Sequence, residues 1–172
     1  GCVYASGTTV WAGAGGALEK STSGGAFSSV QSGTGGGLGV AVSGSNFYLA
    51  TSSGLWVSNA SGASGSFGLK GTAQGLANTG LSGVAVDSGG TVLAVSSSSG
   101  GPNGFYLSQD DGSSFTALGT TMFPRGIYAY GTTWYASTYS GLGISSDGGA
   151  TWTWRGPAQG VQGAANGAWY MP

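Results

Sequence analysis

Residues 126–154 read GIYAYGTTWYASTYSGLGISSDGGATWTW and contain four short runs with the character of β-strands. The runs are 126–129, 134–136, 141–144 and 152–154, and they are rich in aromatic and aliphatic residues. Clusters of Gly, Ser, Thr and Asp separate them, which is the pattern of strands joined by turns. No long stretch of the chain shows the 3.6-residue spacing of an amphipathic helix. The segment therefore predicts a small sheet of four antiparallel strands.

The same series of runs recurs along the chain at intervals of about 41 residues. The aromatic–aliphatic runs begin at Thr9, Phe47, Thr91, Trp134 and Trp169, and shorter glycine-led runs precede most of them. Four short strands per repeat match the blade of a β-propeller. A β-solenoid is the main alternative, but its coils are usually shorter and lack hairpins within a repeat. The sequence therefore predicts an all-β fold, a β-propeller of four-stranded antiparallel blades.

The length of the chain indicates a single domain over residues 1–172. The approximate repeats are 1–38, 39–82, 83–125 and 126–159, and residues 160–172 repeat the first two strands of a further blade. We expect either four blades plus a half or a fragment of a larger ring. An open half-blade exposes unpaired backbone groups, so we expect self-association through the C-terminal half-blade.

Two turns between the third and fourth runs share the pattern Ser-x-Asp-x-Gly-x-(Ser/Thr)-(Phe/Trp). Its positions are Ser108, Asp110, Gly112 and Phe115 in one turn, and Ser145, Asp147, Gly149 and Trp152 in the other. The pattern resembles the Asp-box, or bacterial neuraminidase repeat, of sialidases, sortilin-type receptors, xyloglucan-cleaving glycosidases and photosystem assembly factors. The corresponding segments 21–27 and 58–67 differ in length and lack the Asp.

The turn residues are predicted to be structural. An Asp side chain at a turn accepts a hydrogen bond from a nearby backbone N–H, and Gly provides the positive φ that the reversal needs. The closing aromatic residue packs between sheets and buries about 150–250 Å². The resemblance also implies that such boxes lie away from an active site. Asp87 heads a hairpin turn, which leaves Glu19, expected at an exposed strand edge, and Asp111 without a turn role.

The composition excludes most catalytic mechanisms. Among 172 residues there are no His, one Cys, four Lys and Arg, and five Asp and Glu, with a formal net charge of −1. A Ser–His–Asp triad is therefore excluded, and a zinc or iron–sulfur site is not expected, so we predict no metal and no cofactor. The resemblance implies an arginine trio and a Tyr/Glu pair for sialidase chemistry, which two arginines and one glutamate cannot supply. We expect no enzymatic activity.

The scarcity of charge also limits the partners. No basic face is present to neutralise phosphates, so nucleic acid is not an expected partner. No apolar run reaches 18 residues, so no membrane span is expected. Little charge together with abundant Gly, Ser and Thr suggests an extracellular or cell-surface location.

The candidate ligand-binding residues lie in loops that a propeller gathers at one end. They are Tyr139, Arg125, Phe123, Asn103 and Arg155, with Gln74, Asn78 and Gln159 expected at the same end. Aromatic rings with amide and guanidinium donors suit a neutral glycan. The predicted function is a non-enzymatic extracellular interaction or structural module that completes blades between chains or binds carbohydrate. The alternative is the non-catalytic part of a larger sialidase- or xyloglucanase-like glycoside hydrolase.

Overall fold

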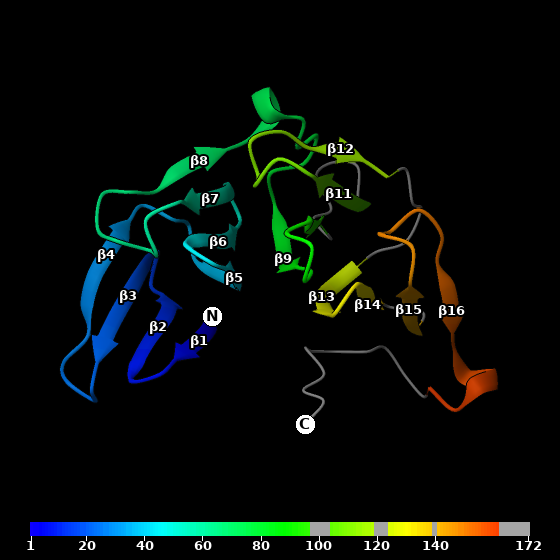
Figure 1. Ribbon diagram of the computed structural model, residues 1–172, viewed down its shortest axis with the longest axis horizontal. Helices are drawn as coiled ribbons and strands as arrows, with labels where there is room; N and C mark the ends of the chain where they lie inside the picture. Colours follow the sequence, from blue (N-terminus) through cyan, green and yellow to red (C-terminus); the bar gives the residue numbers. More distant parts are fainter. Residues whose placement is uncertain (97–103, 119–123, 139–140, 162–172) are drawn as a thin grey trace.

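The chain folds into four antiparallel sheets that follow one another around an open arc (Figure 1). The computed structural model describes residues 1–96, 104–118, 124–138 and 141–161. Each sheet contains four strands that are consecutive in the chain and paired in chain order. This is the predicted architecture: the fold is all-β and consists of propeller blades, numbered here from 1 to 4.

Each blade is a meander of short strands. Blade 1 consists of β1 (Cys2–Ser6), β2 (Thr9–Ala14), β3 (Ala17–Thr22) and β4 (Ser28–Ser32). Blade 2 consists of β5 (Gly37–Ser43), β6 (Asn46–Thr51), β7 (Gly54–Ser58) and β8 (Gly68–Lys70). Blade 3 consists of β9 (Leu81–Val86), β10 (Val92–Ser96), β11 (Gly104–Ser108) and β12 (Thr116–Ala117). Blade 4 consists of β13 (Pro124–Tyr130), β14 (Thr133–Thr138), β15 (Gly141–Ser145) and β16 (Thr153–Arg155).

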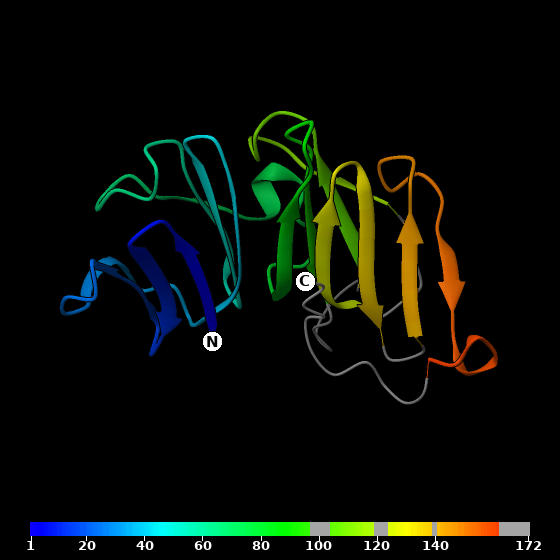
Figure 2. The same ribbon diagram turned by 60° about the horizontal axis from the view of Figure 1, so that its bottom comes forward.

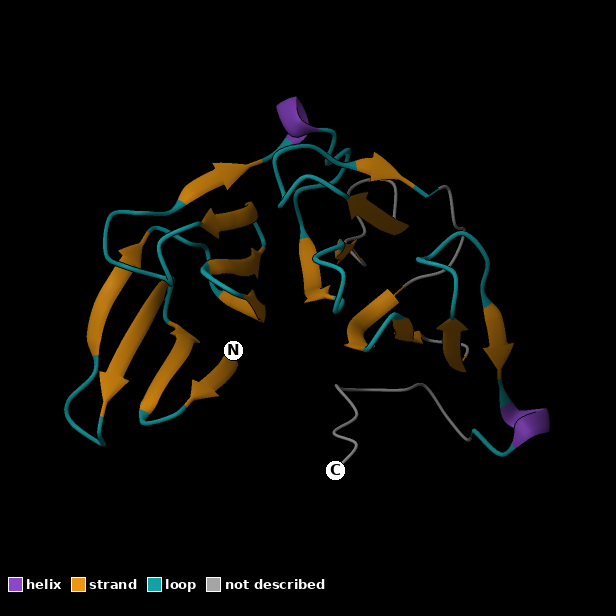
Figure 3. Ribbon diagram, viewed as in Figure 1, coloured by secondary structure: helices purple, strands orange, loops and turns teal. Residues whose placement is uncertain are grey.

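The first strand of every blade lies on the inner side of the arc and the fourth on the outer side (Figure 1). The first strands of adjacent blades are neighbours, as β9 and β13 are in Figure 2. Two short 3-10 helices, η1 (Thr72–Gln74) and η2 (Pro157–Gln159), follow the fourth strands of blades 2 and 4. Both lie on the outer rim (Figure 3), and neither was predicted.

The core consists of three apolar layers, one between each pair of adjacent blades. Successive side chains of a strand point to opposite faces, so a middle blade contributes to two layers. Buried side chains of the first layer are Trp11, Leu18, Phe47 and Leu49. The second layer includes Tyr48, Leu55, Val84, Val92 and Phe115. The third includes Ala85, Phe105, Trp134 and Ala136.

The structure corrects the predicted start of the fourth strands. The run 152–154 predicted that Trp152 opens the fourth strand of blade 4, but the strand begins at Thr153, and the corresponding Phe27, Phe67 and Phe115 also lie immediately before their strands. At Phe115 the physical reason is visible. Its backbone N–H donates to the carbonyl oxygen of Gln74 at 2.7 Å, so it pairs with the connection from blade 2 rather than with its own sheet.

Candidate functional site

The turn between the third and fourth strands of blade 3 is organised around one carboxylate. Asp110 Oδ1 accepts hydrogen bonds from the Ser108 hydroxyl at 2.7 Å and from the Ser114 backbone N–H at 2.9 Å. Asp110 Oδ2 accepts from the Ser114 hydroxyl at 2.6 Å. Ser108 Oγ in turn accepts the backbone N–H of Gly112 at 2.9 Å. All of these partners belong to the turn itself, so the carboxylate holds the loop closed.

Blade 4 repeats this arrangement. Asp147 accepts from the hydroxyls of Ser145 and Thr151 and from the Thr151 backbone N–H, while Gly149 N–H donates to Ser145 Oγ at 2.9 Å. Hydrogen bonds from the residue four positions on, Ser114 or Thr151, are the main cause that lowers the pKa of each carboxyl from 3.8 to about 2. A carboxylate committed in this way is a structural group rather than a proton donor near neutral pH.

The same backbone turn occurs in all four blades, including the two that lack the Asp. Each turn has two consecutive residues with positive φ: Ser23 and Gly24, Ser61 and Gly62, Asp111 and Gly112, Gly148 and Gly149. In blade 2, Ser58 Oγ accepts from Gly62 N–H at 3.2 Å and pairs with the Ser66 hydroxyl at 2.6 Å, where blades 3 and 4 use Asp. The spacing Ser-x-x-x-Gly, shared by blades 2, 3 and 4, is the sequence signal that could have revealed it.

In blades 2, 3 and 4 the glycine at the second position of this pair lies against the preceding blade. A Cβ atom added to Gly112 would lie 3.2 Å from Tyr48 Cε1 and 3.3 Å from Val57 Cγ2 in blade 2. A Cβ on Gly62 would lie 3.3 Å from Trp11 Nε1 in blade 1. Burial, followed by the nearby charge of Asp111, raises the pKa of Tyr48 to about 12. The turns therefore form part of the joints between blades.

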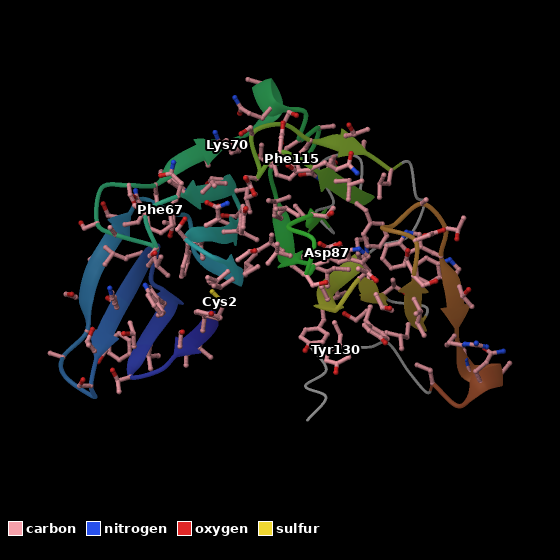
Figure 4. All side chains as sticks on the ribbon, viewed as in Figure 1. Cys2, Phe67, Lys70, Asp87, Phe115 and Tyr130 are labelled. Atoms are coloured by element: carbon pink, nitrogen blue, oxygen red, sulfur yellow. The ribbon has the colours of Figure 1, made fainter. Side chains whose placement is uncertain are left out.

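The aromatic residue after each turn is inserted into the same joint. Trp152 of blade 4 stacks on Phe105 of blade 3, with ring centroids 4.5 Å apart. Phe115 is 7% exposed in the layer between blades 2 and 3, and Phe67 packs edge-on against Phe47 in the layer between blades 1 and 2. Figure 4 labels Phe67 and Phe115 beside these layers. Phe27 of blade 1 has no preceding blade among the described residues and is 49% exposed.

The connection from blade 2 to blade 3 completes the joint. Gln74 ends η1, and its side-chain Oε1 accepts the backbone N–H of Gly71 at 2.8 Å. Gly75 follows with φ +91°, and a Cβ atom there would lie 2.1 Å from the carbonyl oxygen of Phe115. Leu76 is fully buried in the layer between blades 2 and 3. The Gly-x-x-Gln-Gly-Leu segment thus contacts the backbone of Phe115 closely, and glycine at position 75 leaves room for the Phe115 carbonyl oxygen.

The connection after blade 4 has the same local structure. Gln159 Oε1 accepts the backbone N–H of Gly156 at 2.9 Å, and Gly160 follows with φ +81°. Val161 N–H donates to the Gly156 carbonyl at 3.1 Å, as Leu76 N–H does to the Gly71 carbonyl. No atom lies within 4 Å of a Cβ added to Gly160, so among the described residues this receiving segment is unoccupied.

The outward face of blade 4 carries several large apolar side chains together with Arg155, which pairs with Leu142, and it is only partly covered. Strand pairing places Tyr128, Tyr135 and Ile144 on one face of the sheet, with Leu142 two residues before Ile144. The opposite face carries Trp134, which is fully buried against blade 3. Tyr128 is exposed, and the others are half-buried. Tyr130, also exposed, is labelled on the inner side of the arc in Figure 4.

Two of the five predicted glycan-binding residues lie among the residues that the structure describes. Tyr139, Phe123 and Asn103 lie outside the described residues. Arg125 sits at a β-bulge on the innermost strand of blade 4, and Arg155 lies on the outermost strand of the same sheet. Three interstrand spacings separate these strands, about 14 Å in all. The two arginines therefore lie on opposite edges of one sheet, and glycan binding stays a prediction.

Three amide side chains expected in the ligand-binding loops have local partners instead. Gln74 and Gln159 fold back onto the backbone of Gly71 and Gly156, as described above. Asn78 is buried, and its Oδ1 accepts the Gly80 backbone N–H at 2.9 Å. Gln159 is exposed and Gln74 half-buried, whereas the predicted surface position of Asn78 is wrong; the 3-10 turns that use the two glutamines were not predicted.

The remaining acids are dispersed. Asp87 Oδ1 accepts the backbone N–H groups of Gly89 and Thr91, both at 2.9 Å, which confirms its turn role. Glu19 lies in β3, which is paired on both sides, so its expected edge position is wrong. Within the described ranges, no group of three or more Cys, Asp or Glu side chains could hold a metal ion. In the same ranges, no helix is long and apolar enough to cross a membrane.

Comparison with known proteins defines the class of fold. No protein-family model and no curated protein matches the chain. Among solved structures, an ancestral GH74 enzyme is similar with a TM-score of 0.69 and 19% identity, over 88% of this chain and 23% of that one. YCF48 bound to D1 peptide follows with a TM-score of 0.63 and 13% identity, over 88% of this chain and 52% of YCF48.

The Pan2 WD40 domain of Neurospora crassa gives a TM-score of 0.61 at 13% identity, over 86% of this chain and 45% of that one. The chain thus spans less than two thirds of each of these proteins. At these identities the likeness concerns the fold. The chain is part of a β-propeller.

Proposed function

We propose that this chain is a non-enzymatic extracellular interaction or structural module of the Asp-box propeller type. The observation that carries the proposal is the set of exposed or half-buried large apolar side chains on the outward face at each end of the arc. Phe27 and Val3, in blade 1, are 49% and 72% exposed, and Tyr128 and Leu142 lie on the outward face of blade 4. Large apolar patches on a protein surface commonly mark contacts with other macromolecules.

The two complete turns support the Asp-box assignment. In both, a Ser hydroxyl and an Asp carboxylate close the loop, and the aromatic residue that follows packs on the preceding blade. Each carboxylate accepts three hydrogen bonds from its own turn, which favours a structural role over acid–base catalysis. Glu19 and Asp111, the acids left over, belong to blades 1 and 3 rather than to one sheet.

An assay for glycoside hydrolysis tests the non-enzymatic part of the proposal. Purified protein is incubated with xyloglucan oligosaccharides and with sialosides, and the release of reducing ends or free sialic acid is followed. We expect no turnover above the buffer control. Turnover that disappears in a Glu19→Gln, Asp111→Asn double variant would show that the chain itself is a hydrolase and would overturn the proposal.

The likeness to the ancestral GH74 enzyme favours a second candidate function. The chain would then be the non-catalytic part of a larger glycoside hydrolase, because it covers 23% of that enzyme. This candidate predicts that the chain binds and stabilises the remaining blades of the enzyme and restores activity to them. Co-expression with those blades, followed by a xyloglucan assay, distinguishes the two functions.

A further inference from the structure

We propose that Asn59 carries an N-linked oligosaccharide, and that this sugar hydrates a blade with very little charge. Residues Asn59-Ala60-Ser61 have the pattern Asn-x-Ser, with x other than proline, which is the acceptor pattern for N-glycosylation of secreted proteins. It occurs once among the 172 residues. This modification rests on the extracellular location in the proposed function and adds a covalent site to it.

The acceptor side chain is accessible. Residues 59–61 lie in the connection between β7 and β8, and all three are exposed. In the described parts of the chain, no group forms a hydrogen bond with the Asn59 side chain. The amide nitrogen of Asn59 is therefore free to be modified.

The turn itself closes without the Asn59 side chain. Ser58 Oγ accepts the backbone N–H groups of Ala60 and Gly62, both at 3.2 Å. The backbone N–H of Ser61 donates to the carbonyl oxygen of Ser45 at 2.8 Å. A sugar on Asn59 would displace none of these bonds, so the modified chain can adopt the described fold.

The pattern stands where the other blades place their loop-closing carboxylate. Ala60 lies two residues after Ser58, as Asp110 and Asp147 lie two residues after their serines. In blade 2 the hydroxyls of Ser58 and Ser66, 2.6 Å apart, close the loop instead. The residues at positions 59–61 are therefore released from the structural task that their counterparts perform.

Loss of the carboxylate leaves this end of blade 2 without charge. The turn 59–67 contains no charged residue, whereas the corresponding turns of blades 3 and 4 expose Asp110, Asp111 and Asp147. An oligosaccharide on Asn59 would place many hydroxyl groups at the position where the other blades present carboxylates.

The rest of blade 2 has the same need for hydration. Residues 37–70 contain one charged side chain, Lys70, which Figure 4 labels. Two large apolar side chains of this blade, Leu38 and Leu69, are 47% and 44% exposed. Surfaces with little charge and exposed apolar groups tend to associate, and a surface glycan is bulky and solubilising.

The chemical step needs an oligosaccharide donor linked to a lipid pyrophosphate, which the secretory pathway supplies together with its transferase. The Asn59 amide nitrogen forms a bond to the anomeric carbon of the sugar and loses one proton. The bond from that carbon to the pyrophosphate oxygen breaks, and the pyrophosphate leaves with the electron pair. The Ser61 hydroxyl is the second element of the pattern that the transferase recognises.

The mass of the secreted protein tests the proposal. The full chain is directed into the secretory pathway of a eukaryotic cell, and its intact mass is measured before and after treatment with peptide N-glycosidase. We expect a mass increase of one oligosaccharide, which the glycosidase removes while converting Asn59 to Asp. A secreted wild type with the mass of the bare polypeptide would overturn the proposal.

Three variants control this experiment. Asn59→Gln removes the acceptor, and Ser61→Ala keeps the amide but removes the hydroxyl, so both should be secreted without the added mass. Ser64→Ala changes an exposed serine of the same loop outside the pattern and should keep the sugar. Added mass that persists in Asn59→Gln would place the sugar on another residue and would overturn the assignment.

Light scattering over a range of protein concentrations tests the hydrating role. Asn59→Gln should begin to associate at a lower concentration than the wild type, and Ser64→Ala should match the wild type. Equal behaviour of all three would overturn this role. The hydrolysis assay decides the proposed function separately: an unmodified chain without turnover contradicts only the glycan, whereas a modified chain with turnover contradicts only the non-enzymatic function.

Discussion

At the scale of single residues, the turns between the third and fourth strands use two different means to reach one backbone conformation. Blades 3 and 4 close the loop with a carboxylate, Asp110 or Asp147. Blade 2 closes it with the hydroxyls of Ser58 and Ser66. The carboxylate turns depend on ionisation and the hydroxyl turn does not. The stability of blades 3 and 4 should therefore depend on pH more than that of blade 2.

We expect acid to weaken blades 3 and 4 before blade 2. The folded-state pKa of Asp110 and of Asp147 is about 2, below the ordinary value of 3.8. A carboxyl whose pKa is lower in the folded state stabilises the fold fully when the pH is above its unfolded-state pKa. This stabilisation is lost as the pH falls from 3.8 towards 2. An Asp110→Asn, Asp147→Asn double variant should be less stable than the wild type at pH 6 and differ less from it at pH 2. Urea unfolding at both pH values measures this, and an equal difference at both would contradict it.

The glycine at the end of each turn gives a second expectation. Gly112→Ala should destabilise more than Gly44→Ala, although both residues have positive φ. The left-handed conformation costs about 1–2 kcal/mol for alanine at either position. At Gly112 the new Cβ also presses on Tyr48 and Val57, whereas at Gly44 it meets no atom within 4 Å. Urea unfolding of both variants measures this. An equal loss of unfolding free energy in both would show that Tyr48 and Val57 move aside at no cost.

The sequence predicted the Asp turns and identified 21–27 and 58–67 as the corresponding segments without the Asp, but it did not predict that all four share one backbone conformation. Asp110 and Asp147 stand out because a carboxylate followed by glycine is a recognisable turn signal. Ser61 adopts φ +52°, a conformation that L-residues rarely take. Nothing in the residue type of Ser61 announces this conformation. It follows from the packing of the next residue, Gly62, against blade 1.

At the scale of elements, the aromatic residues that precede the fourth strands differ in how deeply they are buried. We expect Phe115→Ala to cost about 3–5 kcal/mol of unfolding free energy, as for large side chains removed from a core. Phe27→Ala should change it by less than about 0.5 kcal/mol in the monomer, because that ring is 49% exposed. Thermal or urea unfolding at low protein concentration measures both. Similar losses would show that Phe27 is packed in solution.

The two 3-10 turns allow another matched comparison. Gly75→Ala should destabilise the monomer more than Gly160→Ala, although their φ values are +91° and +81°. The difference arises because the Gly75 position is closed by the Phe115 carbonyl, whereas no atom of the described residues lies within 4 Å of a Cβ atom at Gly160. Urea unfolding under monomeric conditions gives the comparison. A greater loss for Gly160→Ala would contradict the described joint.

The strands were predictable because aromatic and aliphatic residues alternate with turn residues over short distances. The 3-10 turns were not, although the pattern Gly-x-x-Gln-Gly occurs twice, at 71–75 and 156–160. Their closure depends on a glutamine side chain bending back to a backbone N–H three residues earlier. Such a contact has no periodicity that a sequence scan can detect.

At the scale of the whole molecule, the middle blades have two neighbours and the end blades have one. In an arc of this kind, stability is approximately the sum of the blades and the contacts between neighbours. We expect backbone amides of blades 2 and 3, such as those of Leu49 and Leu81, to exchange with deuterium more slowly than equivalent amides of blades 1 and 4. Mass spectrometry at monomeric dilution measures this. Uniform protection would indicate that the arc unfolds as one unit.

The curvature of the arc could not be predicted from the sequence. The repeat reveals how many sheets form and which residues face a neighbour. The angle between adjacent sheets depends on the side-chain volumes that face each joint, and these differ between blades: Ala85 faces the joint after blade 3, and Tyr128 stands at the same position of blade 4. Those differences accumulate over the arc, so small local errors would change the predicted shape.

Every sheet is complete within one repeat: in the described part of the chain, no strand is lent to a neighbouring blade. The bulged residues Leu38, Ser82 and Arg125, at the same place in three successive blades, mark the length of the unit. A duplication or deletion of one such unit in the gene would add or remove a blade together with its joint, without breaking any strand pairing. Propellers with different numbers of blades could descend from this architecture through single recombination events.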